Sequence, residues 1–209
     1  CIRDRIYNGA TFKGQPVQSY VGGRNGRPLD GATPTSYYLR KHIVEATSFV
    51  TGSEMSYQHI FPFFRYAEVL LNYAEALAAA TQNPDFTGMK GEVEYTLSPR
   101  EALNAVRARY NMPGITETDY AAFVKRLRNE RRVELAFEGH RFWDIRRWKI
   151  GAETTKVYGL TITPQNDGSF SYMRSVIQQR GWEDRMNFYP IADAELFKNH
   201  NLVQNDGWK

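Results

Sequence analysis

The chain has 209 residues, of which 42% are hydrophobic and 14% aromatic, and its formal net charge is +4. This length and apolar content suffice for one sizeable domain or two small ones, so a disordered chain is not expected. No run of about 18 apolar residues occurs, and the opening CIRDRIYNGA resembles no secretory leader. We therefore expect neither a membrane-spanning helix nor an export signal within this sequence.

Residues that commonly bind metals are sparse and scattered. His42, His59, His140 and His200 show no HxxH or HxxxH spacing, and Cys1 is the only cysteine. A zinc site and a disulfide framework are therefore not expected. Cys1 could be the lipid-modified residue of a bacterial lipoprotein, or the point at which a fragment begins.

Residues 1–60 are rich in Gly, Pro, Asn and Tyr, as in GGRNGRPLDGATPTSYY, and show no long helical period. This composition predicts a loop-rich segment with short strands. Residues 61–209 are predicted to be mainly α-helical, and the loop-rich segment is expected to belong to the same domain.

The first predicted helix starts at Phe61, in FPFFRYAEVLLNYAEALAAA, where Pro62 suits the first turn. Its apolar residues follow the i, i+3, i+4, i+7 spacing of a core-facing stripe: Phe63, Ala67, Leu70, Leu71, Ala74, Leu77 and Ala78. The polar residues of the same segment fall on the opposite face: Arg65, Glu68, Asn72 and Glu75.

Three further helices and a hairpin follow. SPREALNAVRARYN predicts a helix capped by Ser98, a third helix spans about 118–138, and HRFWDIRRWK predicts a short fourth that ends at Gly151. KVYGLTIT and SFSYM flank PQNDG and predict a β-hairpin, and DAELFKNH predicts a last short helix. Helices joined in pairs suggest tetratricopeptide-like hairpins, although a clean repeat period is absent.

The stretch RNERRVELAFEGHRFWDIRRW (128–148) interleaves arginines with apolar residues, and residues 125–149 hold nine Lys/Arg against four acids. On a helical wheel, the apolar stripe also takes in four charged residues: Glu130, Arg131, Glu134 and Glu138. Buried carboxylates require nearby cations, which Arg131, Arg141 or Arg146 could supply. The favoured interpretation is a partly buried ion-pair network between the third and fourth helices.

Two other interpretations of this stretch stay open, a nucleic-acid surface and a catalytic pair of carboxylates. Basic charge confined to one segment is a weak sign of nucleic-acid binding. GxSxG, GxxxxGK[ST], HExxH and CxxC are all missing, so neither an enzyme nor a cofactor site is expected.

Three segments have sequences that are more distinctive than a helical period alone requires: FRYAEVLLNYAEALAAA, RNERRVELAFEGHRFWDIRRW and NFYPIADAELFKNHNLVQNDGW. In this order, after the Tyr-rich SYYLRKH, they resemble the carboxy-terminal part of the SusD/RagB family over roughly residues 35–209. The resemblance implies tetratricopeptide-like helical hairpins. It also implies a glycan-binding lipoprotein at the cell surface, which works beside a SusC-like TonB-dependent outer-membrane transporter.

Members of that family are typically much longer, with a helical half, a secretion signal and a lipidated cysteine ahead of the part that is similar here. The resemblance therefore implies a fragment in which Cys1 is not the lipidated residue. The lipid anchor would then belong to the missing amino-terminal part.

Sugar rings stack on flat apolar faces, while polar side chains around them bind the hydroxyl groups. Aromatic residues on helical stripes, such as Phe63, Tyr66 and Phe137, are predicted to pack in the core. Candidate ligand residues are those in predicted loops: Tyr20, Arg24, Asn25, Tyr37, Tyr38 and Trp182. The alternative is a helical scaffold that docks on a partner protein and has no sugar site in this region.

Overall fold

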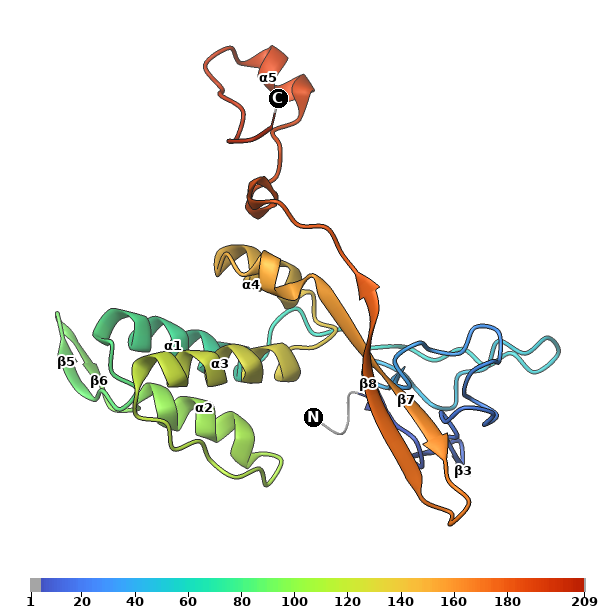
Figure 1. Cartoon of the computed structure of the whole chain (residues 1–209). Coiled ribbons are helices and arrows are strands. Elements are labelled where there is room, and N and C mark those ends of the chain that lie inside the picture. The colour runs from blue at the N-terminus through green and yellow to red at the C-terminus, as the bar shows by residue number, and fades with distance from the viewer. Residues whose placement is uncertain (1–4, 209) are drawn as a thin grey trace. The chain divides into compact units, whose positions relative to one another are not determined.

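The computed structural model describes residues 5–208, which form two compact units (Figure 1). One unit comprises residues 58–141, and the other comprises residues 5–57 together with 142–208. Helices make up 31% of the chain and strands 17%, so the fold is mixed, whereas the sequence predicted a mainly α fold. The predicted helices and the hairpin near the C-terminus are confirmed. Cys1 lies outside the described residues.

Three helices and a small hairpin build the unit of residues 58–141. They are α1 (Tyr66–Thr81), α2 (Pro99–Ala108), α3 (Tyr120–Glu134), β5 (Gly88–Lys90) and β6 (Val93–Tyr95). α1 packs against both α2 and α3. The core consists of their apolar stripes, including Leu70, Leu71, Ala74, Leu103, Val106, Phe123 and Leu127. The alanines of α1 let the neighbouring helices approach closely.

Side-chain caps fix the starts of α2 and α3. The Ser98 hydroxyl accepts a hydrogen bond from the Glu101 backbone at 3.2 Å, while the Glu101 carboxylate accepts one from the Ser98 backbone at 2.8 Å. This reciprocal arrangement is a capping box, so the predicted cap at Ser98 is confirmed. The Asp119 carboxylate caps α3 by accepting from the Ala122 backbone at 2.8 Å.

α1 begins at Tyr66 rather than at Phe61. Its N-cap, Arg65, has an extended backbone, as N-cap residues usually do, and its side chain reaches across to α3. Phe63 lies before the helix and is 88% exposed, and Tyr66 in the first turn is 69% exposed. The prediction that these two rings pack in the core is therefore wrong.

α3 ends at Glu134 rather than near Glu138. Phe137 and Gly139 have φ angles of 65° and 82°, and turns span residues 135–139 before α4 (His140–Arg147). A left-handed residue cannot continue a right-handed helix. Phe137 consequently turns outward and is 50% exposed, so its predicted place in the core is also wrong.

A long antiparallel hairpin organises the other unit. It pairs β7 (Lys156–Pro164) with β8 (Phe170–Gln179), with a bulge between Val157 and Tyr158. β8 extends well beyond the predicted SFSYM, because the Val, Ile and Ser residues that follow continue the extended pattern. Figure 1 shows this pair as the longest strands of the chain.

The N-terminal loops lie along β7. The Val21 backbone donates to the Ile162 carbonyl at 2.8 Å, the Leu160 backbone donates to Thr35 at 3.3 Å, and the Ser36 hydroxyl donates to Leu160 at 2.6 Å. These bonds satisfy β7 on the edge opposite β8. The loop-rich segment is therefore held in place by the hairpin.

Short elements complete this unit. Two small antiparallel pairs join β1 (Arg5–Ile6) to β4 (Tyr38–Leu39) and β2 (Thr11–Phe12) to β3 (Gln15–Pro16). The 3-10 turns η1 (Gly151–Thr154) and η2 (Asp184–Asn187) flank the hairpin, and α5 (Asp193–Lys198) lies near the C-terminus. Over residues 5–208, every helix is too short or too polar to cross a lipid bilayer.

Candidate functional site

The face of α3 that packs on the core carries three buried carboxylates. Glu130, Glu134 and the nearby Glu138 are 7%, 4% and 8% exposed. Arg65 binds two of them, through Nη1 to Glu134 at 2.6 Å and through Nε to Glu138 at 2.8 Å. Its Nη2 also donates to the Glu134 carbonyl at 2.6 Å, so one guanidinium holds the end of α3 against the start of α1.

Burial and hydrogen bonding act on Arg65 in opposite directions. Burial disfavours its charged form, but the hydrogen bonds to Glu138 and Glu134 outweigh this effect and raise the pKa of the guanidinium above its usual range. Arg65 therefore stays charged, and its one positive charge is shared between the two glutamates.

The remaining members of this network tie α3 to α2 and α1. Arg107 on α2 binds Glu130 at 2.5 Å and donates to the Pro113 carbonyl at 2.8 Å. Arg131 is 5% exposed and donates to the Asn72 side chain on α1 at 2.5 Å. Asn72 and Arg65 thus face α3, although the predicted helix placed them opposite its core stripe.

Of the two cations expected from the fourth helix, Arg146 does not bind the three glutamates. Arg141 is half-buried at the second position of α4. Arg146 packs against aromatic rings and donates to the Phe142 carbonyl at 3.0 Å. Sequence reasoning missed Arg65 and Arg107 as partners, because neither lies near the glutamates along the chain.

Among the predicted ligand residues, Tyr20, Arg24 and Asn25 belong to one loop. The Tyr20 ring lies 5.1 Å from the ring of Phe170, at the start of β8. Arg24 donates to the Pro16 carbonyl at 2.5 Å, and the Asn25 side chain accepts from the Gln18 backbone at 3.1 Å. The polar groups of Arg24 and Asn25 therefore shape the loop itself.

Tyr37 and Tyr38 are both half-buried. The Tyr38 hydroxyl donates to the Asn25 carbonyl at 2.7 Å, so the structure does bring these two predicted residues together. The Tyr37 backbone donates to the Thr35 hydroxyl at 3.3 Å. These bonds give both residues a role in holding the loop.

Trp182 lies at the other end of the hairpin from Tyr20. Phe170, which contacts Tyr20, pairs with Pro164 beside the turn, whereas Trp182 follows Gln179 at the open end. At about 3.3 Å per residue, these ends are roughly 27 Å apart. The six predicted ligand residues therefore do not form a single site.

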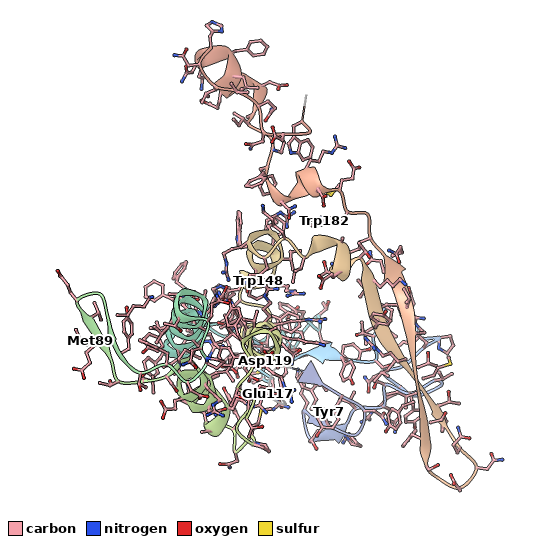
Figure 2. All side chains as sticks on the ribbon, turned by 60° about the vertical axis from the view of Figure 1, so that its left-hand side comes forward. Tyr7, Met89, Glu117, Asp119, Trp148 and Trp182 are labelled. Atoms are coloured by element: carbon pink, nitrogen blue, oxygen red, sulfur yellow. The ribbon has the colours of Figure 1, made fainter. Side chains whose placement is uncertain are left out.

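Arg146 is surrounded by an aromatic cluster that the sequence did not predict as a group. The cluster includes Trp182, which is labelled in Figure 2. The guanidinium carbon lies 3.6 Å from the ring centroid of Phe142, 5.2 Å from that of Trp182 and 5.6 Å from that of Tyr189. Trp143 extends the cluster, with its ring 5.0 Å from Phe142 and 6.3 Å from Tyr189. The sequence signals were Trp182, which was a predicted ligand residue, and the FW pair on a basic helix.

Much of this aromatic cluster is open to solvent. Trp143 is 61% exposed and Tyr189 is 56% exposed. Trp182 packs against Gly151, where a Cβ would lie only 1.9 Å from its ring, so that position requires glycine. Contiguous exposed rings of this kind usually mark a binding surface.

No group of three His, Cys, Asp or Glu side chains between residues 5 and 208 is placed to hold a metal ion. The arrangement of the aromatic cluster suits binding by ring stacking and hydrogen bonding.

The chain belongs to the SusD family, whose model matches residues 5–208, and the resemblance to that family is therefore confirmed. It is 33% identical over 146 residues to SusD-like protein P2 of Formosa agariphila, an alignment that covers 68% of this chain and 24% of that protein. Proteins of the SusD family are non-catalytic binding proteins.

Two solved structures from Bacteroides fragilis have similar folds. A SusD-like protein matches with a TM-score of 0.75 and 28% identity, covering 98% of this chain and 38% of that one. A SusD-like carbohydrate binding protein matches with a TM-score of 0.63 and 29% identity, covering 96% of this chain and 40% of that one. This chain therefore spans well under half the length of these relatives.

Proposed function

We propose that this chain is part of a non-catalytic glycan-binding protein of the bacterial cell surface. The protein would capture oligosaccharides and deliver them to a SusC-like TonB-dependent transporter in the outer membrane. Membership of the SusD family over residues 5–208 carries this proposal. The similar fold of a SusD-like carbohydrate binding protein supports it. A lipid anchor in the amino-terminal part of the longer protein would hold it at the outer membrane.

In this proposal, α1 and α2 form one tetratricopeptide-like hairpin of a longer stack. Their mutual packing and the alanines on the buried face of α1 support this view. Residues 61–209 would then be the carboxy-terminal helical domain of the longer protein, with residues 1–60 as its loop-rich segment.

The described residues offer two places where a sugar ring could stack. One is the N-terminal region that carries Tyr20, Tyr37 and Tyr38, where the rings rather than the engaged polar groups would contact the ligand. The other is the aromatic cluster around Arg146, to which Trp182 contributes.

A titration of this chain against plant, host and microbial polysaccharides, with duplex DNA as a control, tests the proposal. We expect saturable binding of one glycan class, and salt should have little effect on the affinity for the uncharged glycans of that class. Tyr37→Ala and Trp182→Ala, measured separately, would assign the affinity to the loop or to the aromatic cluster. Salt-sensitive binding of DNA alone would contradict the proposal, since phosphate contacts weaken steeply with salt.

One observation favours the second candidate, a module that docks on another protein. An apolar patch precedes and begins α1: Ile60, Phe61, Phe63, Phe64, Tyr66 and Val69, all more than half exposed. Single apolar residues scattered over a surface are normal, whereas several exposed ones in one segment suggest a binding surface. In a longer SusD-like protein, it would suit a further helix packed on α1.

Comparison of self-association between matched variants tests this second candidate. Phe63→Ser with Phe64→Ser should abolish concentration-dependent self-association in light scattering, because it removes the two most exposed rings of the patch. Met89→Ser with Val93→Ser on the exposed β5–β6 hairpin is the control and should leave it unchanged. A strictly monomeric wild-type chain would argue against a docking surface here.

A further inference from the structure

Arg146 differs from the buried arginines of the other unit in its partners. Its guanidinium lies among the rings of Phe142, Trp182 and Tyr189, and it has no carboxylate partner among residues 5–208. Of its five N–H donors, the Phe142 carbonyl takes one at 3.0 Å. Nε is buried and has no acceptor. A cation with unused donors is therefore held in place beside an exposed aromatic surface.

Charges of both signs lie near Arg146 along the chain. α4 and the residues that follow carry Arg147 and Lys149 besides Arg146. The acid of α4, Asp144, is 3% exposed and bound by Arg147 at 3.0 Å. Glu183, the acid next to Trp182, is bound by Arg185 at 2.9 Å. These two acids therefore do not neutralise Arg146.

The aromatic rings supply the other half of a recognition surface. The rings of Trp143 and Phe142 meet edge to face, with an interplanar angle of 88°. Both Trp143 and Tyr189 are more than half exposed. Flat faces of this kind suit the C–H side of a pyranose. The guanidinium of Arg146, 5.6 Å from the ring centroid of Tyr189, suits a carboxylate or sulfate.

We propose that the cluster of Phe142, Trp143, Arg146, Trp182 and Tyr189 binds an acidic sugar. The ring of the sugar stacks on Trp143 and Tyr189, and its anionic group, a uronate carboxylate or a sulfate ester, binds Arg146. This inference rests on the proposed glycan-binding function and narrows it to one place and one ligand class. A neutral sugar offers the Arg146 donors only hydroxyl and ring oxygens, which accept weaker hydrogen bonds than a carboxylate or a sulfate.

Pairs of glycans that differ only in charge provide the test. Oligogalacturonate is compared with its methyl ester, and dextran sulfate with dextran, by calorimetric titration of the 209-residue chain at low and high salt. Duplex DNA serves as an unrelated polyanion. The first pair reports on carboxylate and the second on sulfate, so the two sources of the anionic group are distinguished.

The wild-type chain should bind at least one acidic member about tenfold more tightly than its neutral counterpart, as expected for an added charged hydrogen bond. Arg146→Gln should remove that preference, and Arg146→Lys should keep part of it because the charge remains. Trp143→Ala or Tyr189→Ala should weaken the binding of both the acidic and the neutral glycan of the pair. Thermal melting confirms that each variant is folded.

Arg174→Gln is the matched control. Arg174 also lies on an aromatic ring in the same unit, 3.8 Å from the centroid of Tyr158, but on the exposed hairpin. Its removal should leave the tenfold preference unchanged. A preference lost equally in Arg174→Gln would reflect general charge and would overturn the assignment to Arg146.

Other outcomes distinguish a failure of the acidic-sugar site from a failure of the proposed glycan-binding function. Equal binding of acidic and neutral members, or a preference that survives Arg146→Gln, overturns the acidic site and leaves glycan binding intact. DNA binding as tight as that of oligogalacturonate, and lost in Arg146→Gln, overturns the sugar ligand. Binding of no glycan at millimolar concentration overturns both the site and the glycan-binding function of this region.

Discussion

α3 and α4 come from one basic stretch of sequence but use arginine in different ways. On α3 and in the turn after it, three buried glutamates bind guanidinium groups from the N-cap of α1 and from α2. On α4, Arg146 lies on aromatic rings and faces no carboxylate among the described residues. The comparison teaches that nearby acids, not the arginine content of a segment, decide whether it serves structure or binding.

Removal of Arg65 should have the largest effect on stability. Arg65→Ala leaves Glu134 and Glu138 buried without their guanidinium, which should lower the free energy of unfolding by about 3–5 kcal/mol. Urea unfolding followed by circular dichroism measures this loss. A loss below about 1 kcal/mol would mean that water already solvates the two carboxylates, and the contrast with α4 would fail.

Raising the pH to about 9 should not destabilise the protein in the way that Arg65→Ala does. The pKa of Arg65 is raised in the folded protein, so its contribution is fully present below the ordinary guanidinium pKa and is lost only above it. The urea midpoint of the wild-type chain at about pH 9 should therefore stay far above that of Arg65→Ala at neutral pH. A collapse of the wild-type midpoint at pH 9 would contradict the assigned charge state.

The pair of Arg107 and Glu130 offers a sharper test of the buried network. Either single change, Arg107→Leu or Glu130→Leu, should cost about 3 kcal/mol, because it leaves one buried charge alone. The double change should cost much less, since both charges leave together. A double-mutant cycle in urea measures this coupling, and simple additivity would show that the two residues act independently.

Arg146→Gln should have a smaller effect. No carboxylate loses its partner, so the loss should be limited to cation–π contact, about 1 kcal/mol. Thermal or urea unfolding beside Arg65→Ala measures the difference directly. A loss as large as that of Arg65→Ala would mean that Arg146 holds the fold, and the comparison between α3 and α4 would break.

Arg174→Gln should change stability least, by no more than about 0.5 kcal/mol. Its contact with Tyr158 lies on the exposed hairpin, where water replaces the lost interaction. Thermal melting is sufficient to measure this small change. A larger loss would indicate that hairpin packing depends on the cation, which would make Arg174 unsuitable as a control for Arg146.

Local sequence signals predicted those parts of the fold that depend on neighbouring residues. The capping box at Ser98 involves residues three positions apart, and the β7–β8 hairpin pairs strands across one short turn. The wheel also indicated correctly that Glu130 and Glu134 share the buried stripe of α3. In each case, the relevant partners lie within the same element or across a single connection.

Interactions over long sequence distances were missed for a physical reason. Arg65 meets Glu138 across 73 residues, and the predicted helical period ran back through Phe63 although the helix begins only at Tyr66. The same limit applies to the candidate ligand residues. Tyr20 and Trp182 both lie in loops, but the hairpin holds them at opposite ends.

The sequence by itself determined the apolar stripes, the helix caps, the hairpin and the family to which the chain belongs, because each depends on short-range pattern. The tertiary structure alone decided which arginine neutralises which glutamate, and that Arg146 lies among rings instead. The physical reason is that charge pairing and ring stacking act over a few ångströms in space. Residues far apart in the sequence come within that range only when the chain has folded.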